Sequence, residues 1–463
     1  MQNTEPAIQT ADRRETRGRV INLAFPTIVE NLMATLVQFV DTAMVGGLGA
    51  AATAAVAVNS SPMWLLNGLV MSVGVGGTAL VARMIGAGQR QEAEKACQQV
   101  LIGGLAMGVL LTLLAVFGAQ WLPRLMRADP ALHADAAAYF RIIGFAFIPH
   151  FTGMVLSAVL RGAGDTRTPM LIGVLANGLN VIGNFLLIFP SRLIQVASFS
   201  VPIWGAGWGV RGAAVSTAAS TALAGLLVML AMRRSSRLRL TLRGLRPDGA
   251  LIGRIMRVGL PAAMERVSIN LGQIVFTGMV ASLGTVSLAA HHLALTVESL
   301  SYMPGYGFAA AATTLVGQSL GANAPEDAKR YGALSIRLSL LLMIVLGVAL
   351  LVFARGFMRV FTPDPAVQAV GADLVRICAM EQPFMALAIV CSGALRGAGD
   401  TRAPFGISLI SMWGVRLLAA WLLMFVLGMG VRGAWLAMVA DLVVRGLLTW
   451  RRFERGRWMH MKV

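Results

Sequence analysis

Polar side chains inside two apolar segments are the first candidates for chemistry in this sequence. Asp41 lies in the outer half of one segment. In the other, the amides of Asn177, Asn180 and Asn184 follow an i, i+3, i+7 spacing, which places them on one face of a helix. A carboxylate and amide oxygens together could hold a cation. The alternative is that the asparagines only join neighbouring helices by hydrogen bonds, each contributing about 1 kcal/mol.

The composition places both segments in a membrane. Of 463 residues, 57% are hydrophobic and 13% are charged, which is too apolar for an ordinary soluble domain. A helix needs about 20 apolar residues to cross a bilayer, and long runs without strict alternation favour helices over barrel strands. Twelve such runs are present, at residues 19–45, 56–82, 98–120, 139–160, 168–189, 209–232, 254–281, 287–314, 332–354, 369–395, 404–428 and 432–450.

The formal net charge of +18 follows from membrane topology rather than from nucleic-acid binding. The arginines do not gather on one aromatic-rich face, and most fall in alternate loops, which by the positive-inside rule places both termini in the cytoplasm. The polar start shows no cleavable signal peptide, so the first helix should be an uncleaved anchor. We expect no nucleic-acid partner.

An internal repeat divides the chain into two halves. The sequence Arg-Gly-Ala-Gly-Asp-Thr-Arg at residues 161–167 returns at residues 396–402, an offset of 235 residues that also pairs Glu30 with Glu265. Six spans per half is an even number, so both halves enter the lipid in the same orientation, related by an axis along the membrane normal. We expect an all-α membrane protein of twelve transmembrane helices, in two parallel, pseudo-symmetric six-helix bundles around a central cavity.

The repeat also predicts the segment boundaries. The first half carries about 14 extra residues in the loop from Pro190 to Trp208. The predicted segments are a cytoplasmic tail at 1–18, an N-lobe at 19–232, a basic cytoplasmic linker at 233–253, a C-lobe at 254–450 and a basic cytoplasmic tail at 451–463.

The two halves differ at the candidate cation site. The 235-residue offset pairs Asp41 with Phe276, and it pairs the three asparagines with Met412, Val415 and Ala419. The carboxylate and the amides are therefore peculiar to the first half. This difference favours a cation site inside the N-lobe.

Other polar groups are weaker candidates for a substrate cavity or a proton relay. Glu30 and Glu265 each follow a proline by four residues, which favours a shared structural role, although Glu30 could relay protons to Asp41. The weaker candidates are Glu30, Asn177, Glu265, His291 and Glu298. A lone membrane histidine is more often a packing residue than a relay. The repeated motif supplies candidates for a cytoplasmic gate or a structural turn: Arg161, Asp165, Arg396 and Asp400.

Catalytic and metal chemistry find little support in the sequence. Cys97, Cys378 and Cys391 show no metal-ligand spacing, so we interpret them as packing residues without disulfides. The loops after Gly86 and Gly321 lack the Gly-Lys-Ser/Thr of a phosphate-binding loop. No clustered nucleophile or paired catalytic carboxylates appear. We expect neither an enzyme nor a bound cofactor.

The motifs together resemble the multidrug and toxin extrusion (MATE) family over nearly the whole chain. They are the paired motif at 161–169 and 396–404, Val40 to Gly46, Ala290 to His292, and Val316 to Gly321. The resemblance implies a secondary antiporter that exports organic, often cationic, compounds in exchange for H⁺ or Na⁺ by alternating access. It also implies small organic molecules and the lipid bilayer as partners, function as a monomer, and location in a bacterial inner membrane.

Residue by residue, the resemblance favours proton coupling. Asp41 matches the aspartate that the family uses for coupling, and Asn180 matches a cation-site asparagine, so Na⁺ at these two residues is the alternative. Asn184 stands where several relatives have an aspartate, and the missing negative charge disfavours Na⁺. The acids of the NorM-like branch fall here at Ile269 and Phe384, which favours the DinF-like branch.

A flippase for a lipid-linked saccharide or another lipid remains the alternative function. An anionic lipid would require arginines in the cavity, and the only deep candidates are Arg266 and Arg416.

The NorM-like branch has acids at the positions of Ile269 and Phe384 in this chain. Glu265 and Glu381 lie near these positions and could partly substitute for those acids.

Overall fold

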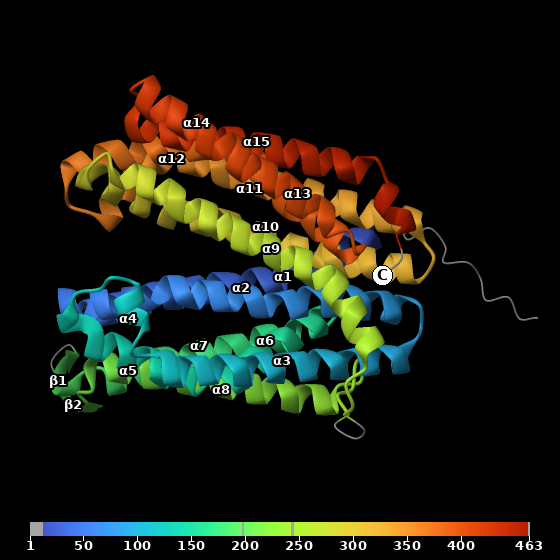
Figure 1. Cartoon of the computed structure of the whole chain (residues 1–463), viewed down its shortest axis with the longest axis horizontal. Coiled ribbons are helices and arrows are strands. Elements are labelled where there is room, and N and C mark those ends of the chain that lie inside the picture. Colours follow the sequence, from blue (N-terminus) through green and yellow to red (C-terminus); the bar gives the residue numbers. More distant parts are fainter. Residues whose placement is uncertain (1–12, 197–198, 242–244, 462–463) are drawn as a thin grey trace, which may run out of the picture.

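The fold is a pair of long helical bundles lying side by side (Figure 1). The computed structural model describes residues 13–196, 199–241 and 245–461. The first bundle contains α1 (Arg13–Gly46), α2 (Ala50–Gly86), α3 (Arg90–Gly118), α4 (Leu122–Leu125), η1 (Pro130–Leu132), α5 (His133–Gly144), α6 (Phe147–Gly162), α7 (Arg167–Leu187), β1 (Pro190–Val196), β2 (Phe199–Ala206) and α8 (Gly209–Arg234).

The second bundle repeats this order without the strands. It contains α9 (Gly249–Ala281), α10 (Thr285–Gly321), α11 (Pro325–Phe361), α12 (Pro365–Gly397), α13 (Arg402–Leu409), η2 (Ile410–Arg416), α14 (Leu417–Trp421), η3 (Leu422–Val426), α15 (Gly430–Glu454) and η4 (Arg457–His460). Here η2 and η3 are π-helical turns that interrupt one span.

The described helices confirm the twelve predicted spans. Eight helices are long and apolar enough to cross a membrane by length and composition, and α5 with α6 forms a further span bent by 56°. The remaining three spans are α9, α10 and α15, which are long helices with more polar side chains. The first helix begins at Arg13, earlier than the apolar run predicts, because Glu15 and Arg19 extend it by an i, i+4 ion pair.

Among the residues that the structure describes, the insertion in the first half is the place where the all-helical expectation fails. The predicted loop forms an antiparallel hairpin in which β1 pairs with β2 and Ile194 lies opposite Val201. A strand is recognised in a sequence by alternating apolar and polar residues. The stretch that contains Leu193, Gln195 and Phe199 is too short to show such an alternation beside twelve long apolar runs.

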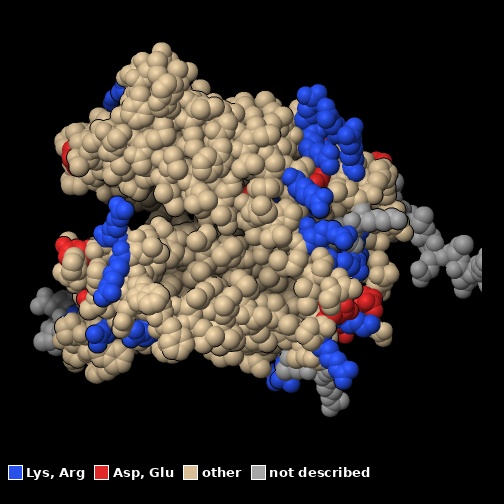
Figure 2. All heavy atoms as spheres, viewed as in Figure 1, with Lys and Arg blue, Asp and Glu red and all other residues tan. Residues whose placement is uncertain are grey.

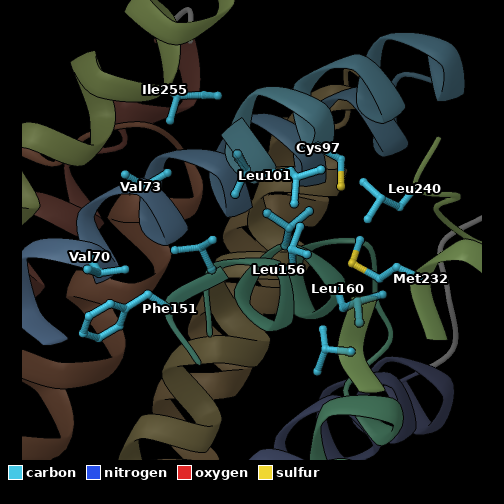
Figure 3. Packing of buried hydrophobic residues seen from close by; sticks show 14 of the residues in the cluster. Val70, Val73, Cys97, Leu101, Phe151, Leu156, Leu160, Met232, Leu240 and Ile255 are labelled. Carbon is cyan, nitrogen blue, oxygen red and sulfur yellow. The ribbon is translucent and has the colours of Figure 1, made fainter. Parts of the chain in front are cut away.

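A dense apolar core holds the first bundle together (Figure 3). Val70 and Val73 of α2, Leu101 of α3 and Phe151 and Leu156 of α6 are all buried in it. Ile255 near the start of α9 joins the same cluster, because α9 crosses from the first bundle to the second (Figure 1). The crossing helix ties the two halves together.

The bundles meet closely at one end, which we call the closed end, where the turns after Gly86 and Gly321 lie. A Cβ on Gly86 would lie 1.9 Å from the carbonyl oxygen of Gln318, and a Cβ on Gly321 would lie 2.0 Å from that of Arg83. These two glycines are repeat mates, so the contact is pseudo-symmetric. At the opposite, open end, a hollow separates the bundles (Figure 2).

Candidate ion-coupling site

Asp41 lies near the end of α1, toward the open end, beside α7. The amide nitrogen of Asn184 donates to Oδ1 of Asp41 at 2.5 Å. Asn184 is buried, and Asp41 is partly exposed. The structure thus brings together two residues that are far apart in the sequence.

Asn180 completes this group. With its amide nitrogen turned toward Asp41, Asn180 donates to Oδ1 and Oδ2 at 2.8 and 3.0 Å, while its oxygen accepts from the Thr217 hydroxyl at 3.2 Å. This orientation satisfies both ends of the amide. Ser216 of α8 also donates to the backbone carbonyl oxygen of Asn180 at 2.8 Å, so α8 contacts both the side chain and the backbone of this residue.

The third asparagine is not part of this network. Asn177 lies on the same face of α7, but within the described residues it makes no hydrogen bond to Asp41, Asn180 or Asn184. Thr217, which the sequence reasoning missed, takes its place. After the insertion the repeat offset is 221 residues, which pairs Thr217 with Met438, so the same asymmetry could have found it.

The arrangement can exchange a small cation at one carboxylate. The amide donors stabilise the ionised form of Asp41. The buried Oδ1 of Asn184 has no hydrogen-bond partner among the described residues. This oxygen can therefore accept a hydrogen bond or contact a cation. Oxygen ligands of this kind suit either a proton carried on Asp41 or a hard cation such as Na⁺.

The glutamates that follow the helix prolines are ion-paired. Arg161 Nη1 donates to both oxygens of Glu30, at 3.1 and 3.2 Å. Arg396 donates to Glu265 at 2.9 Å, and Ser408 donates to the same carboxylate at 3.0 Å. The pairing of these mates supports the structural role expected for both glutamates.

The aspartates of the repeated motif form turns. Asp165 accepts from the backbone N–H and the hydroxyl of Thr168, at 3.0 and 2.7 Å. Asp400 accepts from the backbone N–H of Ala403 at 3.3 Å and from Arg452 at 2.8 Å. Each carboxylate therefore fastens the start of the helix that follows the motif.

The first copy of the motif also joins the bundles at the closed end. Thr314 of α10 donates to the carbonyl of Arg161 at 2.8 Å, and Gln318 donates to that of Gly162 at 3.0 Å. Asp165 lines a cavity of about 530 Å³ beside this contact, together with Arg19 and Arg237. The motif thus contributes to the closed state of this end.

The other candidates lie in the second bundle. Trp435 donates to Nδ1 of the buried His291 at 3.1 Å, which fits a packing role for the ring. Glu298 lies beside Cys378 and Glu381, and Cys378 is also buried in the apolar cluster of the second bundle. Cys97 and Cys391 are free, buried and packed in apolar clusters.

The deep arginines have different surroundings. Arg416 is buried and pairs with Asp441 at 2.6 Å, and Arg445 pairs with the same carboxylate at 2.9 Å. Arg266 is exposed and lies against α2 of the other bundle, where a Cβ on Gly68 would be 2.8 Å from its Cγ. Only Arg266, of these two predicted candidates, is available to the space between the bundles.

Two bundles of membrane-spanning helices, a hollow between them and an intramembrane carboxylate define a membrane transporter. Residues 26–186 and 261–422 match the MatE family model. The chain belongs to this family, that of the multidrug and toxin extrusion transporters, and it is therefore a transporter rather than an enzyme.

Relatives and solved structures agree with this assignment. The chain is 32% identical to the probable multidrug resistance protein NorM of Thermotoga maritima over 447 residues, 96% of this chain and 93% of the relative. It is 29% identical over 451 residues to a protein of the same name from Geobacillus kaustophilus, covering 95% and 96%. A crystal structure of MATE in complex with MaD3S has the same fold, with a TM-score of 0.87, 23% identity and coverage of 95% and 96%. These matches do not separate the DinF-like from the NorM-like branch.

Proposed function

We propose that the protein is a secondary active antiporter of a bacterial inner membrane, which exports organic, often cationic, compounds in exchange for H⁺. The observation that carries this proposal is the partly exposed Asp41 held by Asn184 and Asn180 in the first bundle, with Phe276 at its repeat position. Both relatives described above are named as multidrug resistance proteins. Na⁺ is the alternative coupling ion.

Protonation of Asp41 would change how α1 and α7 pack. The ionised carboxylate accepts from two amides, and a proton on it removes the charge that these hydrogen bonds stabilise. With both termini in the cytoplasm, the hollow at the open end faces outward, so an external proton can reach Asp41. Loss of the charge would release a bound cationic compound and favour the return of the transporter to the state that is open to the cytoplasm.

The proton gradient is sufficient for uphill export. One pH unit supplies about 1.4 kcal/mol per proton, and 100 mV supplies about 2.3 kcal/mol per charge moved. A one-for-one exchange of H⁺ for a monovalent cation moves no net charge, so one pH unit supports a concentration ratio of about tenfold, because ~1.4 kcal/mol is a factor of ten. Export of a neutral compound also gains the contribution of the membrane potential, and the ratio then reaches several hundredfold.

Transport in vesicles tests the proposal directly. A fluorescent organic cation is followed under an imposed pH gradient and, separately, under an imposed Na⁺ gradient, for wild type and Asp41→Asn. We expect H⁺-driven uphill transport in wild type and its loss in the variant. Phe276→Leu, at the repeat position, is the matched control and should keep transport. Transport that depends on Na⁺ alone would reverse the choice of ion.

A lipid flippase is the second candidate, and Arg266 is the observation that favours it. Arg266 has exposed surface between the bundles, and its guanidinium, which lies close to Tyr306 and Glu265, suits an anionic headgroup. In vesicles containing a fluorescent anionic lipid, a flippase would move the lipid between leaflets, and Arg266→Gln would slow it. Cation transport that is unchanged by Arg266→Gln, with no lipid movement, excludes this function.

A further inference from the structure

Arginines from three separate segments line two neighbouring cavities at the closed end, where Figure 2 shows basic side chains gathered. Arg19, Arg167 and Arg237 line the cavity of about 530 Å³ described above. Arg167, Arg234 and Arg237 line the other, of about 390 Å³. Asp165 is the one acidic residue that lines either of them among the described residues. Since the cavities share Arg167 and Arg237, we treat them as one site, the basic cavity.

Asp165 does not neutralise the arginines of the basic cavity. Its carboxylate already accepts two hydrogen bonds within the turn of the motif. Arg237 donates to the backbone carbonyl of Gly164, which carries no charge. Arg167 and Arg234 are exposed and form no ion pair within the part of the chain that the structure describes. An excess of positive charge is therefore available for an anion.

The second bundle supplies its own charged partner at the equivalent place. The 221-residue offset pairs Ala231, which lines the basic cavity, with Arg452. Arg452 donates to Asp400 at 2.8 Å, and Asp400 is 2% exposed. Ala231 is too short to form such a pair with Asp165, the repeat mate of Asp400. The first bundle thus has open space where the second has an internal ion pair.

An aromatic side chain fills the second bundle at a further equivalent position. The same offset pairs Arg237 with Trp458. Trp458 is fully buried, and its ring stacks on that of Phe453 with the centroids 5.1 Å apart. Arg237 is exposed and lines both parts of the basic cavity. The first bundle therefore presents a guanidinium and a cavity where the second presents packed aromatic rings.

The basic cavity lies at the level of the lipid headgroups. Arg167 begins α7 and Arg234 ends α8, each just outside a predicted apolar span. One turn further into these helices, Leu171 and Leu230 are 63% and 54% exposed. Residues four apart share one face of a helix, so each arginine has an apolar surface next to it, toward the membrane centre. A phospholipid has the matching arrangement, with a phosphate beside its acyl chains.

Guanidinium groups bind phosphate oxygens through several N–H donors at once, and basic pockets between helices on the cytoplasmic side suit anionic headgroups. The positive-inside rule places the closed end on that side. We propose that the basic cavity binds the phosphate group of an anionic phospholipid of the cytoplasmic leaflet. Neither Asp41 nor Arg266 lines this site, so it is separate from the antiport and flippase proposals.

A headgroup in the basic cavity contacts both bundles. Leu315 and Gln318 of α10 line the cavity, and Gln318 donates to the carbonyl of Gly162 in the first bundle at 3.0 Å. Arg19 of the first bundle donates to the hydroxyl of Tyr331 in the second at 3.3 Å. The lipid therefore lies where the closed end is held together, and its binding stabilises this end.

Native mass spectrometry of the purified, delipidated full chain in detergent tests the proposal. The probes are phosphatidylglycerol, which is anionic, and phosphatidylcholine, which has no net charge. We expect phosphatidylglycerol to bind about tenfold more tightly than phosphatidylcholine, and Arg167→Gln and Arg237→Gln each to weaken its binding about fivefold, as the loss of one basic contact predicts. Arg402→Gln is the matched control. Arg402 is the repeat mate of Arg167 and is equally exposed, so this variant should bind phosphatidylglycerol as wild type does.

Hydrogen–deuterium exchange gives a second readout. Phosphatidylglycerol should slow backbone amide exchange at residues 315–325 in wild type but not in Arg237→Gln, and exchange that does not respond to the lipid would overturn its placement between the bundles.

Three binding results would overturn the proposal: equal affinity for the two lipids, an equal loss of affinity in Arg402→Gln, or displacement of the lipid by inorganic phosphate at the same concentration, which would make the ligand a soluble phosphate. These measurements need neither transport nor lipid movement, so a failed transport assay rejects the antiport alone.

Discussion

Arg161 donates two hydrogen bonds to Glu30, and Arg396, its repeat mate, pairs with Glu265 in the second bundle. In both bundles the pair joins the first helix, α1 or α9, to the end of the helix that carries the repeated motif, α6 or α12. The halves have therefore kept the same internal fastening while their acidic sites diverged. The two ion pairs occupy equivalent positions, but their carboxylates differ in burial.

Loss of the second-bundle pair should cost more stability than loss of the first. Glu265 is 7% exposed and Glu30 is 22% exposed, and an unpaired charge is more costly when it is more deeply buried. Arg396→Gln leaves Glu265 unpaired, and we expect it to lower the free energy of unfolding by about 2–4 kcal/mol. Arg161→Gln leaves Glu30 unpaired and should lower it by about half as much. Thermal unfolding in detergent measures both, with the exposed Glu326→Gln as control; the opposite order would contradict the argument.

An added carboxylate beside Asp41 should create a Na⁺ site. In Asn184→Asp the new oxygen stands where an amide now donates to Asp41, so the two carboxylates repel unless a cation lies between them. We expect Na⁺ affinity to rise at least about tenfold, since ~1.4 kcal/mol is enough for that factor. Calorimetric Na⁺ titration of the purified protein measures the change.

Asn177→Asp is the control for this experiment. It adds the same charge about two helical turns from Asn184, at a residue that is not hydrogen-bonded to Asp41. If both variants gain equal Na⁺ affinity, the effect comes from general charge rather than from the arrangement around Asp41.

Asp441 should be more important for stability than either arginine that it binds. Arg416 and Arg445 both pair with its buried carboxylate, so Asp441→Asn leaves two guanidinium groups without their counter-charge. Breaking a buried pair in this way costs about 3–5 kcal/mol. Arg416→Met leaves the Asp441 and Arg445 pair intact and should cost less. Denaturation of both variants in detergent gives the comparison, and equal losses would show that Arg416 and Arg445 do not share one counter-charge.

A methyl group at the closed end should separate the bundles there. The Cβ of Gly321→Ala would lie 2.0 Å from the carbonyl oxygen of Arg83, whereas a Cβ on Gly253 meets no atom within 4 Å. We expect faster backbone amide exchange around residues 80–90 and 315–325 in Gly321→Ala and no change in Gly253→Ala. Hydrogen–deuterium exchange with mass spectrometry follows both segments, and exchange as slow as in wild type would mean that the contact relaxes without opening.

The architecture could be predicted because its signals are long and repeated. Twelve apolar runs and a 235-residue offset determine the spans, the two bundles and the pairing of positions such as Glu30 and Glu265. The N-lobe site was also accessible, since Asp41 and Asn180 stand out against their apolar mates. In each case a periodicity or an internal comparison supplied the evidence.

Contacts between helices were not accessible in this way. Nothing in the sequence indicates that Thr217 faces Asn180, that Cys378 and Glu381 face Glu298, or that Arg416 faces Asp441. These contacts depend on how each helix is rotated about its axis, and near Arg416 the π-helical turns shift that rotation. A repeat offset pairs equivalent positions in different bundles, but it does not show which side chains meet within one bundle.

The β1–β2 hairpin gives the molecule a landmark that its pseudo-symmetry otherwise lacks. It projects from the first bundle at the open end (Figure 1), and the second half has no equivalent insertion. An antibody fragment raised against the hairpin would mark one bundle and one end of the particle at once. In electron microscopy of a small membrane protein whose halves look alike, that mark would fix both the alignment of the images and the sidedness of reconstituted vesicles.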